Sequence, residues 1–196
     1  TLFRSMGYSD MGYSDIGCFG GEIETPNPDR LAENGVRFTN CYNTSRCCPT
    51  RASILTGLYQ HEAGYGYMDS DLGYPSYQGR FQEGAVTVAQ LLQGAEYRTL
   101  MLGKWHLGHQ QKFMPNKQGF DYFYGVPYSN DMDNYFYKRI QFQSPPLPLY
   151  KNEKLIEEGP DQKYLTKRYT EAAQKFIQEN KKRPFFLYLA HSMPHL

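Results

Sequence analysis

The hydrophobic pattern of the chain changes three times from helical spacing to the alternation or the continuous apolar run of a strand. The first change falls in the segment TPNPDRLAENGVRFTNCY. Here Asn27 suits a helix N-cap, Pro28 the first helical position and Gly35 the end of the helix. Residues 36–42 then alternate between apolar and polar side chains. The segment therefore predicts a helix followed by a strand.

Two later segments repeat this order. Residues 86–93 have a helical pattern, and residues 97–102 are typical of a buried strand. The third helix begins near Asp161 and is followed by a strand, FFLYLA, at residues 185–190. Its apolar stripe is made of Leu165, Tyr169, Ala172, Ala173, Phe176 and Ile177. Such alternation of helix and strand favours an α/β sheet with helices on its faces.

A polar cluster follows each expected strand, at residues 43–51, 103–108 and 191–196. Ligands of open α/β sheets bind beyond the carboxyl ends of the strands, so we expect the three clusters at one edge. Residues 110–160, rich in Tyr, Pro and Asn, are expected to leave the sheet and build the walls of a site. Nothing in the pattern marks a second domain, and residues 1–196 are expected to form a single one.

Composition excludes several classes of protein. With 196 residues, 40% hydrophobic and 21% charged, the chain is long enough to bury one core. A net charge of +1 gives no reason to expect nucleic acid or an anionic membrane as a partner, because both recruit basic stripes. The longest apolar run, residues 185–190, is far too short to span a membrane. Most of the 18 Tyr and 12 Phe are expected to pack, and a minority to line a sugar or aryl pocket.

Candidate chemistry begins with two adjacent cysteines, Cys47 and Cys48, in NTSRCCPTRASILTG. Pro49 suits the first turn of a helix, and a thiol at a helix N-terminus is reactive or able to hold an oxyanion. The alternative is that both thiols are small buried hydrophobes, as most free cysteines are. The four cysteines form neither a disulfide framework nor a CxxC pair suited to zinc, so the redox compartment stays open.

Two motifs give a family resemblance. Cys47, Pro49 and Arg51, continued by Leu-Thr-Gly, resemble the first signature of the type I, formylglycine-dependent sulfatases, and YRTLMLGKWHLG resembles the second. MGYSDIGCFGGEIETPNPDRLAENGVRFTN and GVPYSNDM are similar to arylsulfatase A-like members. The similarity covers nearly the whole chain. It implies an alkaline-phosphatase-like (sulfatase) fold, with a mixed, mostly parallel sheet flanked by helices, here the N-terminal part of the catalytic domain and incomplete at both ends.

The resemblance implies a sulfuric ester hydrolase with a modified nucleophile. In this family the first cysteine of the motif, here Cys47 and not Cys48, is oxidised to formylglycine by a formylglycine-generating enzyme. One hydroxyl of the hydrated aldehyde attacks sulfur, and the other lets the adduct collapse and expel sulfate. An ordinary serine or thiol has no second hydroxyl. The thiol would therefore be a precursor of the nucleophile.

Three more residues of the two motifs receive catalytic roles from the resemblance. Arg51 would orient the formylglycine, Lys104 would bind a sulfate oxygen, and His106 would contact the formylglycine and act as the base for sulfate release. The alternatives are a solvated Lys104 and a His106 that only makes structural hydrogen bonds. Trp105 between them is expected to pack.

The substrate side is expected to include two further residues. His195 matches the family's histidine that approaches the leaving-group oxygen, and His191 matches it less well. Ser129, in PYSND, matches a serine that contacts the substrate, while ordinary turn chemistry explains a serine there equally well.

The resemblance also implies a divalent cation, usually Ca²⁺, with hard oxygen ligands. Family members place an adjacent Asp pair before MGYSD, but here Asp10 is preceded by Ser9 where an Asp is expected. The tandem repeat MGYSDMGYSD has replaced that ligand. Asp10 and the formylglycine formed from Cys47 are the expected ligands, and the others would come from a C-terminal half that these 196 residues do not contain.

Two hypotheses follow. The first is a sulfatase acting on a sulfated small molecule or glycan, exported in its full-length form to a periplasmic, extracellular or lysosomal compartment. The second is a non-catalytic or inactive fragment that only binds anions. A related phosphatase or phosphodiesterase is disfavoured, because those enzymes use Thr or Ser where Cys47 stands. Aryl, glycosaminoglycan and algal-glycan esters all stay open as substrates.

Overall fold

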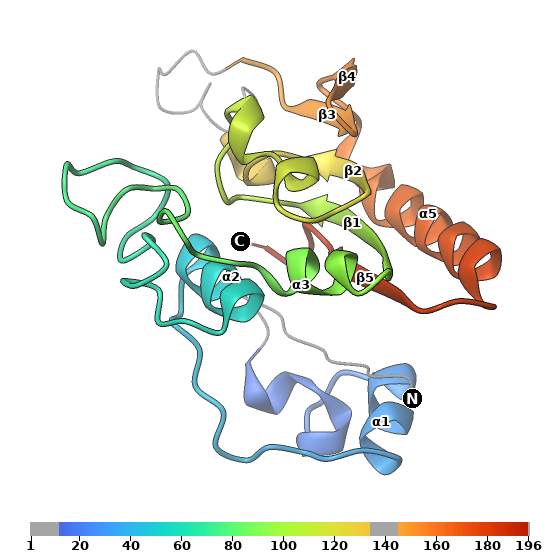
Figure 1. Ribbon diagram of the computed structural model, residues 1–196. Helices are drawn as coiled ribbons and strands as arrows, with labels where there is room; N and C mark the ends of the chain where they lie inside the picture. Colours follow the sequence, from blue (N-terminus) through green and yellow to red (C-terminus); the bar gives the residue numbers. More distant parts are fainter. Residues whose placement is uncertain (1–11, 134–144, 196) are drawn as a thin grey trace. The chain divides into compact units, whose positions relative to one another are not determined.

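The computed structural model describes residues 12–133 and 145–195, which fall into two compact units (Figure 1). The first unit contains the described residues up to Ser45 together with Pro194 and His195, and the second runs from Arg46 to Met193. The expectation of a single domain over residues 1–196 stays a prediction.

The first unit contains the helix expected after residue 25. Helix α1 spans Pro26–Glu33 and follows two short 3-10 helices, η1 at Tyr13–Asp15 and η2 at Gly17–Phe19. The prediction of Asn27 as N-cap is wrong by two residues, because Pro26 already occupies the first helical position and Thr25 is the cap residue.

The strand expected at residues 36–42 does not form. Val36 and Phe38, two of its apolar residues, are largely exposed. A strand needs a hydrogen-bonded neighbour, and no described residue pairs with this segment in a ladder. Apolar alternation alone does not supply that partner. The polar cluster at residues 43–51 therefore follows an irregular segment and not a strand.

The second unit is built on a five-stranded mixed sheet with the order β4-β3-β2-β1-β5. Strand β1 (Arg98–Lys104) lies between β2 (Tyr122–Val126) and β5 (Phe185–Ala190) and is parallel to both. Strands β3 (Pro148–Lys151) and β4 (Lys154–Glu158) continue the sheet as an antiparallel hairpin beside β2. The mixed sheet confirms the predicted fold class. The motif GKWHLG begins in β1, the strand with a parallel neighbour on each side.

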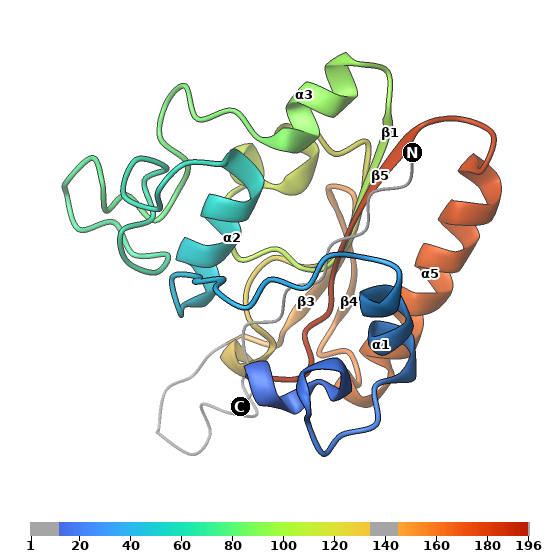
Figure 2. The ribbon, with the colours of Figure 1, turned by 90° about the horizontal axis from the view of Figure 1, so that it is seen from below.

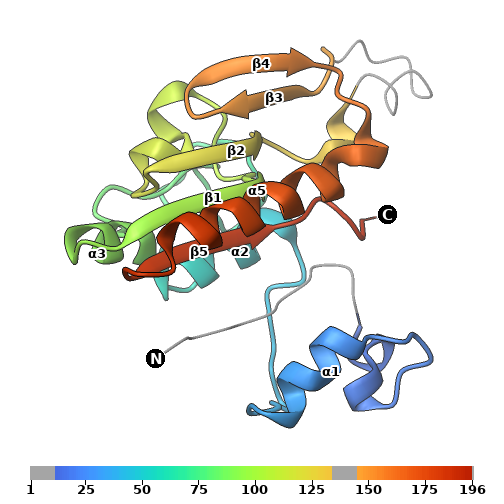
Figure 3. The ribbon, with the colours of Figure 1, turned by 90° about the vertical axis from the view of Figure 1, so that its right-hand side faces the viewer.

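Helices cover both faces of this sheet (Figures 2 and 3). Helix α5 (Leu165–Asn180) packs on one face through Tyr169, and its core cluster includes Leu100 and Leu102 of β1. Helices α2 (Cys47–Thr56) and α3 (Val88–Gly94) contribute to the core cluster of the other face, which contains Met101 of β1. The alternation of these three β1 side chains explains why all of them are buried: successive residues of a strand point to opposite faces.

The second and third helix–strand pairs are confirmed. Helix α3 leads into β1, and α5 leads into β5, close to the residues expected. Thr87 caps α3 by accepting a hydrogen bond from the backbone N–H of Gln90, whose side chain accepts from the Thr87 N–H in return. In the described part of the chain, no helix combines the length and apolar character needed to cross a bilayer.

The expectation that residues 110–160 leave the sheet is wrong, because β2, β3 and β4 all lie in this stretch. Their four or five residues each, rich in Tyr and with a proline at the start of β3, give little periodicity to recognise. Gly125 shows why β2 fits beside β1: a Cβ at this position would meet the backbone of Gly103. Close backbone approach thus replaces side-chain packing at this point.

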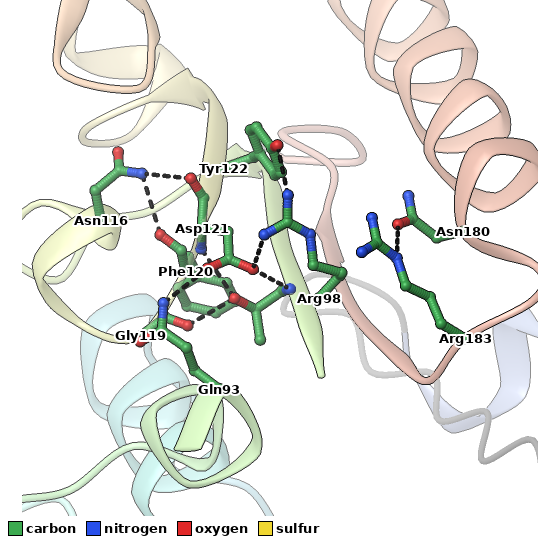
Figure 4. Close-up of polar contacts among 10 residues, drawn as sticks. Gln93, Arg98, Asn116, Gly119, Phe120, Asp121, Tyr122, Asn180 and Arg183 are labelled. Atoms are coloured by element: carbon green, nitrogen blue, oxygen red, sulfur yellow. Dashed lines mark hydrogen bonds and ion pairs between the residues drawn. The ribbon is translucent and has the colours of Figure 1, made fainter. Parts of the chain in front are cut away.

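The amino ends of β1 and β2 are joined to α3 through Asp121 (Figure 4). Its carboxylate accepts hydrogen bonds from the Thr99 backbone N–H at 3.1 Å and from the Gln93 side chain at 2.8 Å. The Thr99 hydroxyl in turn donates to the Gly119 carbonyl at 2.8 Å and accepts from the Asp121 N–H at 2.9 Å. One carboxylate therefore ties three elements together at the edge opposite the motif residues.

We expect Asp121→Ala to lower the free energy of unfolding by about 1–3 kcal/mol, because it leaves the Thr99 N–H without its acceptor. Urea unfolding followed by circular dichroism measures the change. Asp71→Ala is the matched control, since Asp71 makes an exposed ion pair with Arg80, and should cost less than about 1 kcal/mol. Equal losses for the two variants would contradict the role given to Asp121.

Candidate active site

Helix α2 places the two adjacent thiols in different environments. The helix begins at Cys47 after Arg46, whose backbone is extended, and ends at Thr56, followed by Gly57 as a C-cap in the left-handed conformation. Cys48 is fully buried in the core, whereas Cys47 is partly exposed. The description of a small buried hydrophobe therefore fits Cys48 alone. Cys47 stands at the first turn of the helix, where backbone N–H groups favour an anion.

Lys104 reaches Cys47 from the carboxyl end of β1. Its ammonium lies 3.3 Å from the Cys47 sulfur and donates to the Ser129 hydroxyl at 2.8 Å. Ser129 follows β2, which is parallel to β1, so both side chains come from the same edge of the sheet. The structure thus brings together three of the residues singled out in the sequence.

The ammonium of Lys104 is almost completely buried, with 1% of the residue exposed. Burial lowers its pKa, and the nearby Arg51 guanidinium lowers it further, while Cys47 and Asp131 oppose these effects. Among the described residues, its hydrogen-bond partners are a thiol and a hydroxyl, and neither is a carboxylate that could neutralise the ammonium. A buried cation of this kind favours an anionic ligand, which would offset the cost of its burial.

Arg51 fastens the helix to the strand. It lies one turn after Cys47 in α2, and its Nη1 donates to the backbone carbonyl of Lys104. The contact connects α2 to the end of β1 and accounts for the approach of Lys104 to Cys47. Arg51 thereby brings a second positive charge to the same edge.

His106 is held two residues beyond the strand by its neighbours. Trp105 and Leu107 on either side are fully buried, and the Trp105 indole donates to the Phe113 carbonyl at 3.0 Å, which confirms that Trp105 packs. Gly103, just before this segment, has φ +97, and a Cβ there would meet the carbonyl of Ala190 in β5. The backbone of GKWHLG is therefore tightly constrained where it presents Lys104 and His106.

The imidazole of His106 lies between the two thiols and a carboxylate that the sequence did not single out. Its Nε2 is 3.6 Å from Asp69 Oδ2, too long for a hydrogen bond but within ion-pair distance. Burial lowers the pKa of His106, but the interactions with Asp69 and with the thiols of Cys47 and Cys48 outweigh it and raise the pKa to about 10. His106 also lowers the pKa of Asp69. Asp69 lies in an irregular segment between α2 and α3, where no motif or period marks it.

Among the remaining predicted residues that the structure describes, only His191 lies in the same unit as this site. His195 belongs to the other unit, and Asp10 and Ser9 lie outside the described residues. His191 follows β5 and is half-buried, with its ring centroid 6.3 Å from that of Tyr169; burial lowers its pKa. The roles expected for these residues stay predictions.

The groups described around residue 47 do not by themselves fit a divalent cation. Across residues 12–133 and 145–195, no set of three or more His, Cys, Asp or Glu side chains is arranged to hold a metal ion. The nearest side chains to the Cys47 thiol include the ammonium of Lys104 and the imidazole of His106, which disfavour a cation when charged. A metal site would need ligands beyond these, such as the expected Asp10.

Comparison with known proteins shows which family the chain is similar to. The family model described as Sulfatase matches residues 8–196. Arylsulfatase G of Rattus norvegicus is 35% identical over 95% of this chain and 40% of its own length. Arylsulfatase A of Homo sapiens is 36% identical over 97% of this chain and 39% of its own length. The chain thus spans about two fifths of the length of these curated relatives.

Solved structures give the same result for the fold. The crystal structure of Ps i-CgsB superposes with a TM-score of 0.75 at 34% identity, covering 95% of this chain and 44% of that one. The crystal structure of the PsFucS1 sulfatase from Pseudoalteromonas sp. gives a TM-score of 0.73 at 25% identity, covering 95% and 42%. With the family model matching nearly all of its residues, the chain belongs to the sulfatase family.

Proposed function

We propose that this chain carries the nucleophile and the anion-binding groups of a sulfuric ester hydrolase that uses formylglycine at position 47. The observation that carries the proposal is the position of Lys104, whose buried ammonium contacts the side chains of both Cys47 and Ser129. A cation next to the nucleophile and shielded from water would bind a sulfate group well, because a sulfate ester stays anionic around neutral pH. Charge on its non-bridging oxygens would be stabilised most where water is excluded.

The three charged groups have different tasks in this proposal. Lys104 binds a non-bridging oxygen of the sulfate. Arg51 holds the end of β1 against α2 and adds positive charge near residue 47. His106, whose pKa is raised to about 10, is positively charged at neutral pH while residue 47 is a cysteine; it would take the proton at sulfate release from its neutral form, once conversion of Cys47 to formylglycine has removed one of the interactions that raise its pKa. Ser129 donates or accepts a hydrogen bond at the substrate while bonded to Lys104.

The chemistry needs the aldehyde, for which the Cys47 thiol is the precursor. In the aldehyde hydrate, one hydroxyl loses its proton and its oxygen bonds to sulfur, while the bond from sulfur to the alcohol oxygen breaks and the alcohol leaves with a proton. The second hydroxyl then loses its proton, the C=O bond re-forms, and the bond from carbon to the sulfate oxygen breaks. Water rehydrates the aldehyde. The covalent step is thus divided into two easier ones.

The proposed cofactor and substrate follow from the family. A divalent cation, Ca²⁺ by resemblance, would be held by hard oxygen ligands that include Asp10. The substrate would be a sulfated small molecule or glycan; Ps i-CgsB, which is similar to this chain, has been solved in complex with k-i-k-neocarrahexaose. A formylglycine-generating enzyme would be the partner that modifies Cys47.

When the chain is produced together with a formylglycine-generating enzyme, we expect Cys47 and not Cys48 to be converted, because the spacing to Pro49 and Arg51 marks Cys47. Peptide mass spectrometry should show a mass about 18 Da lower than that of the thiol, the difference between CH₂SH and CHO. Cys48→Ala should be converted as the wild type is, and Cys47→Ala should not. Modification at Cys48 would rule out the assignment.

Lys104→Met should weaken binding of inorganic sulfate at least tenfold, since a charge-assisted hydrogen bond contributes about 1.5–3 kcal/mol. Methionine keeps the length of the side chain and removes the ammonium. Trp105, the only tryptophan of the chain, stands next to Lys104, so its fluorescence can follow the titration.

Lys167→Met is the matched control, because Lys167 is an exposed lysine of α5 paired only loosely, at 3.9 Å, with Glu171. Its sulfate affinity should equal that of the wild type. Sulfate binding that survives Lys104→Met unchanged would place the anion site elsewhere. Binding that depends on Lys104, without turnover of an aryl sulfate by the converted chain, would favour an inactive anion-binding fragment.

A further inference from the structure

We propose that Asp69 is a positioning residue for His106: its carboxylate holds the Nε2 side of the imidazole, so that the ring stays turned toward the side chain of residue 47. This inference rests on the function proposed above, since it concerns the group that would take the proton during sulfate release. Asp69 itself touches neither the nucleophile nor the sulfate in this proposal. It acts only through His106.

The surroundings of the imidazole show why it needs such a partner. The His106 side chain is 4% exposed, and neither ring nitrogen has a hydrogen bond of normal length to any described residue. Its other polar neighbours are the thiols of Cys47 and Cys48, which are weak donors and weak acceptors. The Asp69 carboxylate at 3.6 Å is the charged group that can decide the orientation of the ring.

The backbone at His106 is itself constrained. His106 has φ +56, a conformation that residues other than glycine rarely adopt, and it lies between two fully buried side chains. Strained backbone of this kind persists where the surrounding structure holds it and is common at functional sites. Because the backbone is held, the His106 ring can move only by rotating about its side-chain bonds. The Asp69 carboxylate would restrict this rotation.

Asp69 lies near the His106 ring in a loop whose two sides are bonded to each other. Tyr65 and Tyr77 form an isolated antiparallel bridge, and the Gly66 N–H donates to the Ser76 carbonyl at 2.7 Å. Tyr65 is fully buried and anchors the start of the loop in the core. Gly79 comes so close that a Cβ on it would meet the backbone of Asp69. The loop therefore presents Asp69 from a supported backbone.

In this arrangement the two nitrogens of the His106 ring face different groups. In the neutral imidazole, an Nε2–H directed at Asp69 would leave Nδ1 as the acceptor toward the side chain of residue 47; in the charged ring both nitrogens carry a proton, and the same orientation is kept. A histidine whose one nitrogen is held by a carboxylate has a defined ring orientation, which is a common way to prepare a proton acceptor. Without Asp69 the ring could turn over and exchange the two nitrogens.

The test uses the unmodified chain labelled with ¹⁵N-histidine, and reads the five imidazoles by long-range ¹H–¹⁵N NMR. His106→Gln assigns the His106 signals. In the wild type we expect an Nε2–H signal of His106 that is protected from solvent exchange. Asp69→Ala should abolish that signal and move the His106 ring resonances, while His61, His191 and His195 keep theirs and show that the fold is intact; His109, whose charge also acts on Asp69, is left out of this control. Asp69→Glu, which restores a carboxylate, should recover the signal.

Asp71→Ala is the matched control, because Asp71 is an exposed aspartate two residues away that pairs with Arg80. Its spectrum should match that of the wild type at His106. Should Asp69→Ala not fold, the nearly isosteric Asp69→Asn provides the same comparison, with a shift of the His106 resonances expected. His106 signals that are unchanged in the folded Asp69 variant would overturn the positioning role. Because this experiment needs neither formylglycine nor turnover, that outcome is distinct from a failure of Cys47 to be converted.

Discussion

The site depends on one contact between a helix and a strand. Arg51 of α2 donates to the backbone carbonyl of Lys104, the last residue of β1, and so joins two elements that are far apart in the sequence. Because Cys47 is one turn before Arg51, this contact also sets the distance between the Cys47 sulfur and the Lys104 ammonium. Loss of the contact would let α2 move away from β1 and would carry the Cys47 sulfur away from the Lys104 ammonium. The charged groups of the site are therefore supported by backbone geometry as much as by one another.

The helix gives two neighbouring cysteines opposite environments. Successive residues of an α-helix point about 100° apart, so when Cys48 faces the core with Ala52 and Leu55, Cys47 is turned to the edge of the sheet. The parallel strands β1 and β2 end at that same edge and present Lys104 and Ser129. An accessible sulfur beside a buried cation thus follows from ordinary helix and sheet geometry.

The parts of the fold that could be predicted are those with a strong local signal. Helix α5 has a long amphipathic stripe, and β5 is a continuous apolar run, so both are evident in the sequence. The segment 36–42 alternates like a strand, yet pairing depends on a neighbour that local pattern does not reveal. The three strands β2, β3 and β4 are too short to show a period. Asp69 was missed for a related reason: an acidic residue in an irregular loop looks like a solvated one until the loop is folded against His106.

The close approach of the strands at Gly103 has a consequence for how such a site can diversify. A side chain at Gly103 would collide with the carbonyl of Ala190, and one at Gly125 would collide with the backbone of Gly103. The adjoining strands β1 and β2 therefore form a floor beneath the site, at which Gly103 and Gly125 tolerate almost no other residue, whatever the substrate. In the loop between α2 and α3, exposed side chains such as those of Tyr67 and Tyr74 are under no such restriction, whereas Gly79 is, because a Cβ there would meet the backbone of Asp69. Divergence among proteins with this floor should accumulate in the loop, where a change of side chain alters what the site accepts without disturbing the strands below it.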